Sequence, residues 1–508
     1  MVRPFVPHAA TRSLVFGLTC LALGCGARTT LSVGEDAGRR DGGGDAATLR
    51  DAGRDAGPPD SGPPPAPPCR SDAACEDGEV CRAEEAFTPS DLTALPLTCG
   101  RPFAGSAVGT ACQGRDACDR GLCVAAGTCV RPCISETDCD DGELCREVYV
   151  LTSRSTMQTL EACVARVAAP DTVDVNIGGS LFVDLAAASF DPIDMTANTL
   201  VVYQGDADAV AVLAEIRDAA GDTVFDVTAL GSVDPDWGIN PVALNGFVTL
   251  AYPNGPRSPD PGVYDLGLAA QFDSTNTERT VARRTGDGTV LDLDLYLAGG
   301  NRWTSPDGSI PPGLALGVES ARAILRDGAG LELGDIRVHE IVGGLRSRFS
   351  VLRGGVPPFD APADLADLYR LSAGARRASV HVFFVRQIEG ALGIASGIPG
   401  VQVLPGTGAS GVAISADLIP IDELGTVIAH EVGHYLGLFH TTENSGQLSD
   451  PYDDTAECPA SLDTNGDGFV APSECAGSGA ENIMFWAGSG TELSPQQGAV
   501  LRGSMVPR

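Results

Sequence analysis

Short apolar runs separated by turn residues dominate residues 170–285. Branched and aromatic side chains recur within the runs, whereas glycine, proline, asparagine and aspartate gather between them. Regularly spaced short strands of this kind predict a β-sandwich, and because no residue in it indicates chemistry, we interpret it as an accessory domain. The expected strands cover residues 173–177, 200–203, 209–216, 224–227, 247–251 and 263–268.

From Leu291 onward the pattern changes to strands that alternate with helices. Leucine stands at every second position up to Leu297, as in a strand, and apolar residues recur at helical spacing over 314–326. Further strands are expected at 336–341 and 379–385, and helices at 363–372 and 421–437. This order predicts an α+β domain over residues 288–508.

A short strand at 410–415 is expected at the edge of the sheet in that domain. An open edge there can bind an extended peptide as an added strand. An ordinary strand inside a mixed sheet is the alternative interpretation.

Residues 1–25 have the pattern of a targeting segment. An apolar stretch at 14–23 follows two arginines and is too short to span a bilayer. It ends in Ala22-Leu23-Gly24-Cys25, which looks like a bacterial lipoprotein cleavage site with Cys25 as the lipidated residue. An ordinary signal peptide cut nearby is the alternative. Gly26 is unlike the aspartate that retains lipoproteins at an inner membrane, so we expect the outer membrane or cell surface, or secretion.

Residues 26–68 consist mostly of aspartate, alanine, glycine, arginine and proline. Such a segment cannot bury enough apolar surface to fold, which predicts a disordered linker; a proteolysed pro-segment is the alternative. Beyond the targeting segment no stretch approaches 18 apolar residues, so an N-terminal lipid is the only membrane attachment that we expect.

Twelve of the 16 cysteines lie between residues 69 and 163 and include an internal repeat. Two groups of four are separated by the same 5, 5 and 17 residues and lie 64 residues apart, which indicates two copies of one disulfide module. The groups, with a differently spaced third between them, are Cys69, Cys75, Cys81 and Cys99; Cys112, Cys118, Cys123 and Cys129; and Cys133, Cys139, Cys145 and Cys163.

The cysteine modules over residues 69–166 imply an oxidising compartment and six bridges, whose connectivity the sequence leaves open. Structural zinc is a weaker interpretation, because the region lacks histidine and the C-x2-C spacing. The modules are either a rigid spacer or a surface that recognises a substrate or a cell.

Length and charge narrow the class of protein further. At 508 residues the chain is too long for one core, which predicts several domains. Its net charge of −33 excludes nucleic acid as a partner, since phosphates would be repelled. The oligomeric state is left open.

The sequence from residue 430 to residue 440 reads HEVGHYLGLFH and carries the chemistry of the chain. On a helix, residues four apart lie on one face, so His430 and His434 present two imidazoles to one point. Glu431, one step round the helix, can reach a water at that point. The pattern therefore predicts a zinc site with an acid–base group beside it.

Two more residues of this stretch complete the predicted site. Gly437 can adopt the positive φ that ends a helix, and the resulting turn brings His440 back as a third nitrogen ligand. Three protein ligands leave the fourth position of zinc open, as in catalytic sites. The alternative is an amphipathic helix with half-exposed histidines. His339 and His381 stand singly in apolar runs, which is typical of core or surface histidines.

The extended motif resembles the signature of the metzincin metallopeptidases. A second signature of that family is a methionine turn, for which Met484 is the candidate, although a methionine in an apolar run is also typical of plain core. With residues 453–455 and 493–497, the zinc motif and Met484 are similar to the pappalysin/cytophagalysin group. Members of that group commonly carry a tyrosine where Trp486 stands, and because indole only donates, a role that needs a phenol does not carry over.

The motif and the resemblance together predict a secreted or surface-anchored zinc endopeptidase that acts on proteins or peptides. In this mechanism Glu431 is the general base that takes a proton from the zinc-bound water and passes it to the leaving amine. The alternative is a cell-surface binding protein with a vestigial peptidase domain, and a calcium-dependent adhesin is a third interpretation. The intact Glu431 and histidines argue against both.

Residues 463–474 match a twelve-residue calcium loop. The expected ligands are Asp463, Asn465, Asp467, Glu474 and the backbone carbonyl of Phe469. Proline and glycine replace the usual flanking helices, and Cys458 and Cys475 bracket the loop, so we expect a disulfide there as a clamp. A surface turn that binds nothing is the alternative.

Overall fold

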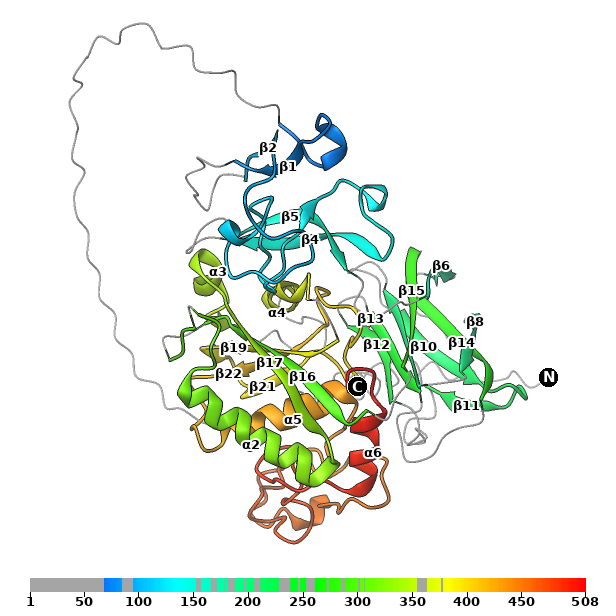
Figure 1. The fold of residues 1–508 in the computed structure, drawn as a ribbon. Coiled ribbons are helices and arrows are strands. Elements are labelled where there is room, and N and C mark those ends of the chain that lie inside the picture. The colour runs from blue at the N-terminus through cyan, green and yellow to red at the C-terminus, as the bar shows by residue number, and fades with distance from the viewer. Residues whose placement is uncertain are drawn as a thin grey trace, which may run out of the picture.

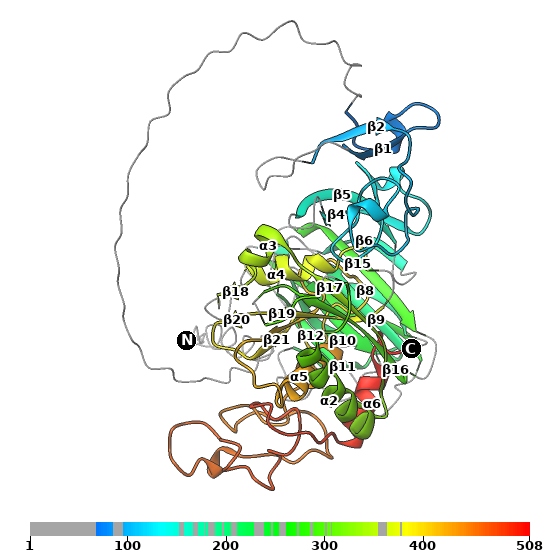
Figure 2. The ribbon, with the colours of Figure 1, turned by 60° about the vertical axis from the view of Figure 1, so that its left-hand side comes forward.

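The computed structural model describes most of the chain beyond residue 67 (Figures 1 and 2). The described residues are 68–84, 95–151, 157–165, 171–177, 179–180, 188–195, 198–204, 211–227, 238–244, 247–252, 261–271, 274–284, 288–299, 302–305, 307–353, 363–375 and 378–508. The predicted targeting segment, Cys25 and the predicted linker up to residue 67 lie outside them. The predicted succession of a disulfide-rich region and a sheet-rich region is confirmed.

The cysteine-rich region contains six disulfides, and its two repeated modules share one connectivity. In each copy the first cysteine pairs with the third and the second with the fourth. The bridges are Cys69–Cys81, Cys75–Cys99, Cys112–Cys123, Cys118–Cys129, Cys133–Cys145 and Cys139–Cys163. All twelve cysteines are therefore oxidised and offer no thiolate to a metal. The elements are η1 (Asp72–Ala74), β1 (Val80–Ala83), β2 (Leu97–Gly100), η2 (Arg115–Ala117), β3 (Arg131–Pro132), η3 (Glu136–Asp138), β4 (Glu143–Leu151) and β5 (Met157–Ala165).

The all-β region is rich in strands, as the sequence predicts. Its strands form one ten-stranded sheet, and among the described residues its two halves are joined at the pair Val212 and Val242. Both halves contribute to one core, for example through Val201 and Leu266. The strands are β6 (Asp171–Ile177), β7 (Gly179–Ser180), β8 (Ser189–Met195), β9 (Asn198–Gln204), β10 (Ala211–Arg217), β11 (Thr223–Asp226), β12 (Gly238–Leu244), β13 (Phe247–Tyr252), β14 (Gly262–Gln271) and β15 (Ser274–Arg284).

Four of these strands, β7, β8, β12 and β15, have no counterpart in the sequence prediction. Pro192 and Pro241 stand inside β8 and β12, and β15 is largely polar, so none of the three has the pattern of a buried strand. Proline is tolerated in β8 because, among the strands that the structure describes, β8 pairs with β14 alone and lies at an edge.

The C-terminal region contains a five-stranded sheet in the order β17-β16-β19-β22-β21. The first four strands run parallel and β21 is antiparallel to β22. The elements are β16 (Val290–Leu297), α2 (Pro312–Ala329), β17 (Glu332–Glu340), α3 (Gly343–Arg348), β18 (Val351–Leu352), α4 (Ala363–Tyr369), η5 (Arg370–Ser372), β19 (Val380–Val385), β20 (Gln387–Ile388), β21 (Gly393–Ala395), β22 (Val412–Ser415), α5 (Leu424–Leu436), η6 (Ala460–Leu462) and α6 (Pro495–Gly503).

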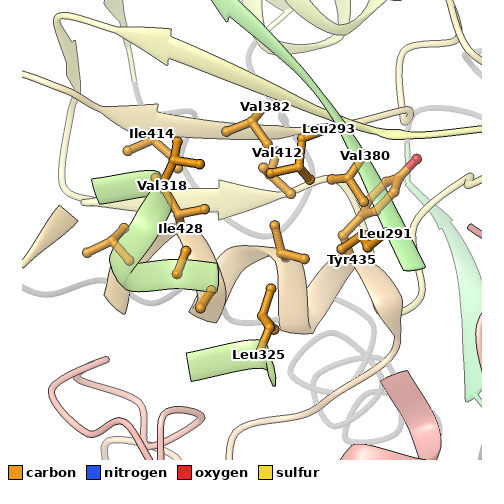
Figure 3. Packing of buried hydrophobic residues seen from close by; sticks show 14 of the residues in the cluster. Leu291, Leu293, Val318, Leu325, Val380, Val382, Val412, Ile414, Ile428 and Tyr435 are labelled. Carbon is orange, nitrogen blue, oxygen red and sulfur yellow. The ribbon is translucent and has the colours of Figure 1, made fainter. Parts of the chain in front are cut away.

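Helices α2 and α5 cover one face of this sheet. Alternate strand residues such as Leu293 and Val382 pack there against Val318 of α2 and Ile428 of α5 (Figure 3). Full burial of one such side chain contributes about 2 kcal/mol. The pleat sends their neighbours, such as Phe383, to the opposite face.

The second face of the sheet is also buried, because α4, η5 and the cysteine-rich region pack on it. Tyr149 and Met157 of that region share a core with Tyr296. The contact continues at Gln113, whose side-chain amide donates to the carbonyl of Asp307 at 3.1 Å. Central strands of a sheet that is covered on both faces carry apolar residues on both sides, as these strands do.

The polar positions of β16 are buried beneath this cover. Asp294 is 2% exposed and accepts hydrogen bonds from His339 at 2.7 Å and from Arg337 at 2.8 Å. These partners lower the pKa of Asp294 to about 2 against the opposing effect of burial. His339 therefore has the satisfied core role expected of it.

The prediction that residues 410–415 form the edge strand is wrong. Strand β22 lies between β19 and β21, and β21 is the edge. Only three residues, Gly393 to Ala395, make up β21, which is too short for a strand pattern in the sequence. No helix of the described residues is long and apolar enough to cross a membrane.

Candidate metal centre

Helix α5 and the turn that ends it position the three histidines of the motif. Gly437 follows the last helical residue with a φ of 119°, and its N–H donates to the carbonyl of His434 at 2.9 Å. A residue with a side chain rarely adopts that φ. The chain reverses there as predicted, so His440 returns to the helix.

The Nε2 atoms of the three histidines converge on one point. They lie 3.1 Å apart for His430 and His434, 3.0 Å for His434 and His440, and 3.3 Å for His430 and His440. Tetrahedral ligands at zinc–nitrogen distances of about 2.0–2.1 Å stand about 3.4 Å from one another. The three rings therefore fit one metal ion, and they form a group of ligand atoms able to hold one.

The other ring nitrogens show that the converging atoms carry lone pairs. Nδ1 of His430 donates to the carbonyl of Ile483 at 2.6 Å, and Nδ1 of His434 to that of Leu438 at 2.7 Å. A carbonyl oxygen only accepts, so Nδ1 bears the proton in both rings. Burial lowers the pKa of His430 to about 3 and the pKa of His434 well below its usual value, so both rings are neutral. Their Nε2 atoms face each other without a proton between them, an arrangement that a cation stabilises.

Glu431 lies beside the histidines in a buried position. It is 1% exposed, and its Oε2 has no hydrogen-bond partner among the described residues. Burial raises the pKa of Glu431 to about 8, although the backbone N–H of Ala395 on β21 acts in the opposite direction. A carboxylate with an elevated pKa and an unused oxygen is suited to accept and return a proton.

Strand β21 also limits the space around Glu431. A methyl group on Gly393 would lie 2.4 Å from Cγ of Glu431, closer than carbon atoms can approach. Glycine at this position therefore lets the edge strand contact the carboxylate directly. The sequence alone gave no sign of this role, because a Gly-Ile-Ala segment resembles a loop.

Met484 lies beneath the centre and is fully buried. Its sulfur would be 2.7 Å from a methyl group on Gly433, so helix α5 packs tightly on it. Its carbonyl accepts the N–H of Thr441 at 2.9 Å, and its neighbour Ile483 holds His430. The methionine segment, residues 482–486, thus contacts His430 through Ile483 and Thr441, the neighbour of His440, through Met484.

The sequence prediction missed two contacts near the histidines. Oε1 of Glu443 lies 3.0 Å from Nδ1 of His440. The indole N–H of Trp486 donates to the carbonyl of Val470 at 2.7 Å. No motif marks Glu443, although it lies only three positions from His440, and the partner of Trp486 lies 16 positions away.

The predicted calcium loop is exposed and organised by its own backbone. Asp463 accepts the N–H groups of Gly466 and Gly468, and Glu474 accepts those of Thr464, Asn465 and Ala471. Asn465 and Asp467 accept from the residues two positions further on. Phe469 is 47% exposed.

The carboxylates of this loop are more dispersed than the histidines. Asp463, Asp467 and Glu474 are not among the groups of described residues whose ligand atoms lie within 4.8 Å of one another. Cys458 and Cys475 form the disulfide expected around the loop, with a Cα–Cα distance of 5.6 Å, and both are buried.

Comparison with known proteins adds little to this geometry. No family model matches the chain, and no curated protein does. Among solved structures, mirolysin in complex with compound 9 is 15% identical with a TM-score of 0.29, over 43% of this chain and 91% of that one. A family two carbohydrate esterase from Clostridium thermocellum in complex with cellohexaose is 12% identical with a TM-score of 0.12, over 42% and 61%. At such TM-scores the likeness carries no argument, so the function rests on the site itself.

Proposed function

We propose that the protein is a zinc-dependent endopeptidase. The observation that carries this proposal is the convergence of three Nε2 atoms within 3.3 Å, with Nδ1 of His430 and His434 committed to carbonyl oxygens. Neutral imidazoles are the ligands that zinc prefers, and three of them leave one coordination position open. The metzincin-like spacing of the motif is consistent with this choice of metal.

Glu431 is the acid–base group of the proposed reaction. A zinc ion held by the three histidines would polarise the scissile carbonyl and lower the pKa of a water from its bulk value to about 7. Glu431 accepts the proton of the attacking water on its unused Oε2 and transfers it to the leaving amine. Burial raises the pKa of this carboxyl, which strengthens it as a proton acceptor.

Strand β21 is the proposed site for an extended substrate. It is the last strand of its sheet, and no described strand pairs with its outer side. The same strand contacts Glu431 through Gly393 and Ala395. A peptide added along this edge would therefore pass close to the acid–base group.

Calcium is the second proposed cofactor, bound by residues 463–474. The spacing of oxygen-bearing residues and the inward-turned carboxylates support it. Millimolar calcium should raise the melting temperature of the protein, and Asp463→Ala or Glu474→Ala should abolish that response without loss of zinc. An unchanged melting temperature with calcium would refute this part of the proposal.

Anchoring by a lipid on Cys25, at the outer membrane or cell surface, is proposed from the sequence of the targeting segment. The native protein should partition with detergent, and Cys25→Ser should be released as a soluble form. Wild-type protein found wholly in the soluble fraction, without an acyl group on its N-terminal peptide, would contradict the anchor.

The endopeptidase activity is tested by digestion of a peptide library with the purified protein. We expect cleavage within peptides that stops with a zinc chelator and returns when zinc is added. Binding of peptides without cleavage, in protein that holds stoichiometric zinc, would instead favour a surface binding protein with a vestigial peptidase domain.

A further inference from the structure

The third histidine of the centre is held differently from the other two. His430 and His434 lie on α5, and each donates to a backbone carbonyl. His440 lies beyond the turn at Gly437, where no helix fixes its position. Its Nδ1 is 3.0 Å from a carboxylate oxygen of Glu443, and the two side chains are 2% and 24% exposed.

A carboxylate partner affects a ligating imidazole more than a carbonyl does. Its full negative charge strengthens the hydrogen bond from Nδ1, fixes the tautomer and increases the electron density at Nε2. Loss of such a partner typically weakens metal binding about 10- to 100-fold. The carboxylate of Glu443 thus fixes the orientation of His440, whereas α5 fixes the positions of His430 and His434.

A tight turn holds Glu443 in place. The N–H of Glu443 donates to the carbonyl of Leu448 at 2.9 Å, and the N–H of Gly446 donates to the carbonyl of Glu443 at 2.8 Å. Gly446 has a φ of 64°, and a methyl group there would lie 2.5 Å from the nitrogen of Ala460. The turn is therefore pressed against the disulfide-bracketed insert, residues 458–475.

The insert binds this turn through three of its own N–H groups. Val470 donates to the carbonyl of Asn444 at 2.8 Å, and Ala460 to that of Gly446 at 2.9 Å. Cys458 donates to the hydroxyl of Thr442 at 2.9 Å. The insert thus helps to fix the segment between His440 and Leu448, together with the bond from Thr441 to Met484.

Val470 connects the insert to the methionine segment as well. It is fully buried against Phe485, and its carbonyl accepts the indole N–H of Trp486 at 2.7 Å. Indole has no other polar hydrogen, so this bond uses the whole hydrogen-bonding capacity of Trp486. One residue of the insert therefore joins the turn of Glu443 to the segment beneath the histidines.

We propose that Glu443 and Trp486 are positioning residues of the metal centre. Glu443 orients His440 directly, whereas Trp486 acts through Val470 and the turn that carries Glu443. The inference rests on the proposed function only in that the three histidines bind a metal. It assigns to the insert a role in holding the third ligand, whether or not the insert binds calcium.

The role of Glu443 is tested by titration of the metal-free protein with cobalt(II), followed by visible absorption. We expect Glu443→Ala to bind cobalt about 10- to 100-fold more weakly and with shifted bands. Glu443→Gln should fall between this variant and the wild type, because its amide oxygen still accepts the Nδ1 proton. Glu319→Ala, at an exposed position on α2, is the matched control and should leave affinity and spectrum unchanged.

The titration uses no substrate, so its outcomes separate the two proposals. Wild-type cobalt affinity and bands in Glu443→Ala would overturn the positioning role while the endopeptidase proposal stands. A wild-type protein that binds no cobalt would defeat the endopeptidase proposal itself.

The role of Trp486 is tested by Trp486→Phe, which removes the N–H and keeps an aromatic ring. We expect bound cobalt to dissociate several-fold faster, because the carbonyl of Val470 loses its partner. Trp303→Phe is the control: Trp303 is buried in the core against Phe384, so this variant shares a loss of stability but should keep the wild-type rate. Equal dissociation rates in Trp486→Phe and the wild type would overturn this role.

Discussion

The histidine centre and the loop at residues 463–474 both have the sequence of a metal site, yet the chain builds them in opposite ways. In the centre Glu431 is buried, one of its oxygens has no partner among the described residues, and burial raises its pKa to about 8. In the loop Glu474 accepts several backbone N–H groups, chiefly that of Ala471, which lower its pKa to about 2. Burial thus favours the protonated form of Glu431, whereas hydrogen bonds favour the ionised form of Glu474.

The difference follows from what holds each site. The centre depends on α5, the methionine segment and β21, which come together only in the folded domain. The loop depends on hydrogen bonds between residues within twelve positions of one another. We therefore expect changes in the centre to abolish function and changes to the carboxylates of the loop to act locally.

Replacement of a ligand should have the largest effect. His434→Ala leaves two imidazoles, which hold zinc poorly, so we expect loss of the metal and of peptide hydrolysis down to background. Metal content measured by mass spectrometry checks this, with Glu474→Ala as the control that keeps its zinc. Stoichiometric zinc in His434→Ala would show that the three histidines are not the ligand set.

Removal of the proposed acid–base group should come next. Glu431→Gln has no carboxylate to accept a proton but leaves every ligand in place, so hydrolysis should fall at least about 10^2-fold with full zinc content. Steady-state kinetics and metal content on the same preparation check both parts. Wild-type turnover in this variant would rule out the mechanism.

A smaller effect is expected from β21. Gly393→Ala places a methyl group against Glu431, so the carboxylate must shift, and we expect kcat to fall about 10-fold while zinc stays bound. Gly114→Ala, where a methyl group meets nothing within 4 Å, is the matched control. Equal kcat values for the two variants would show that β21 does not influence Glu431.

The smallest effect concerns acid stability of the calcium-free loop. Because folding lowers the pKa of Glu474 from 4.5 to about 2, its stabilising contribution is complete above about pH 4.5 and disappears as the pH falls towards 2. Glu474→Gln should therefore melt a few degrees below the wild type at pH 6, and the difference should vanish near pH 2. A difference that does not depend on pH would mean that the charge of Glu474 contributes nothing.

The sequence predicted the centre well where local geometry determines it. The spacing of His430 and His434 on a helix and the positive φ of Gly437 follow from residues within one short stretch, and α5 begins and ends near the expected positions. The repeated disulfide module also follows from spacing alone. Its connectivity does not, because any pairing of four cysteines closes loops of acceptable length.

The remaining contacts join residues that are distant in the chain. The carbonyl of Ile483 holds His430 across 53 positions, and Trp486 reaches Val470 across 16. Asp294 is buried against His339 and Arg337, which lie 45 and 43 positions away, so the alternation of aspartate with leucine did not reveal its partners. Pairing partners, rather than composition, also decided that polar β15 is a strand.

X-ray absorption at the zinc edge of the purified wild-type protein reports which atoms bind the metal. We expect one zinc per chain, with three imidazole nitrogens at about 2.0–2.1 Å and one oxygen ligand. A protein purified with zinc available that holds none, or zinc bound by sulfur or by fewer than three imidazoles, would contradict a catalytic centre made by His430, His434 and His440.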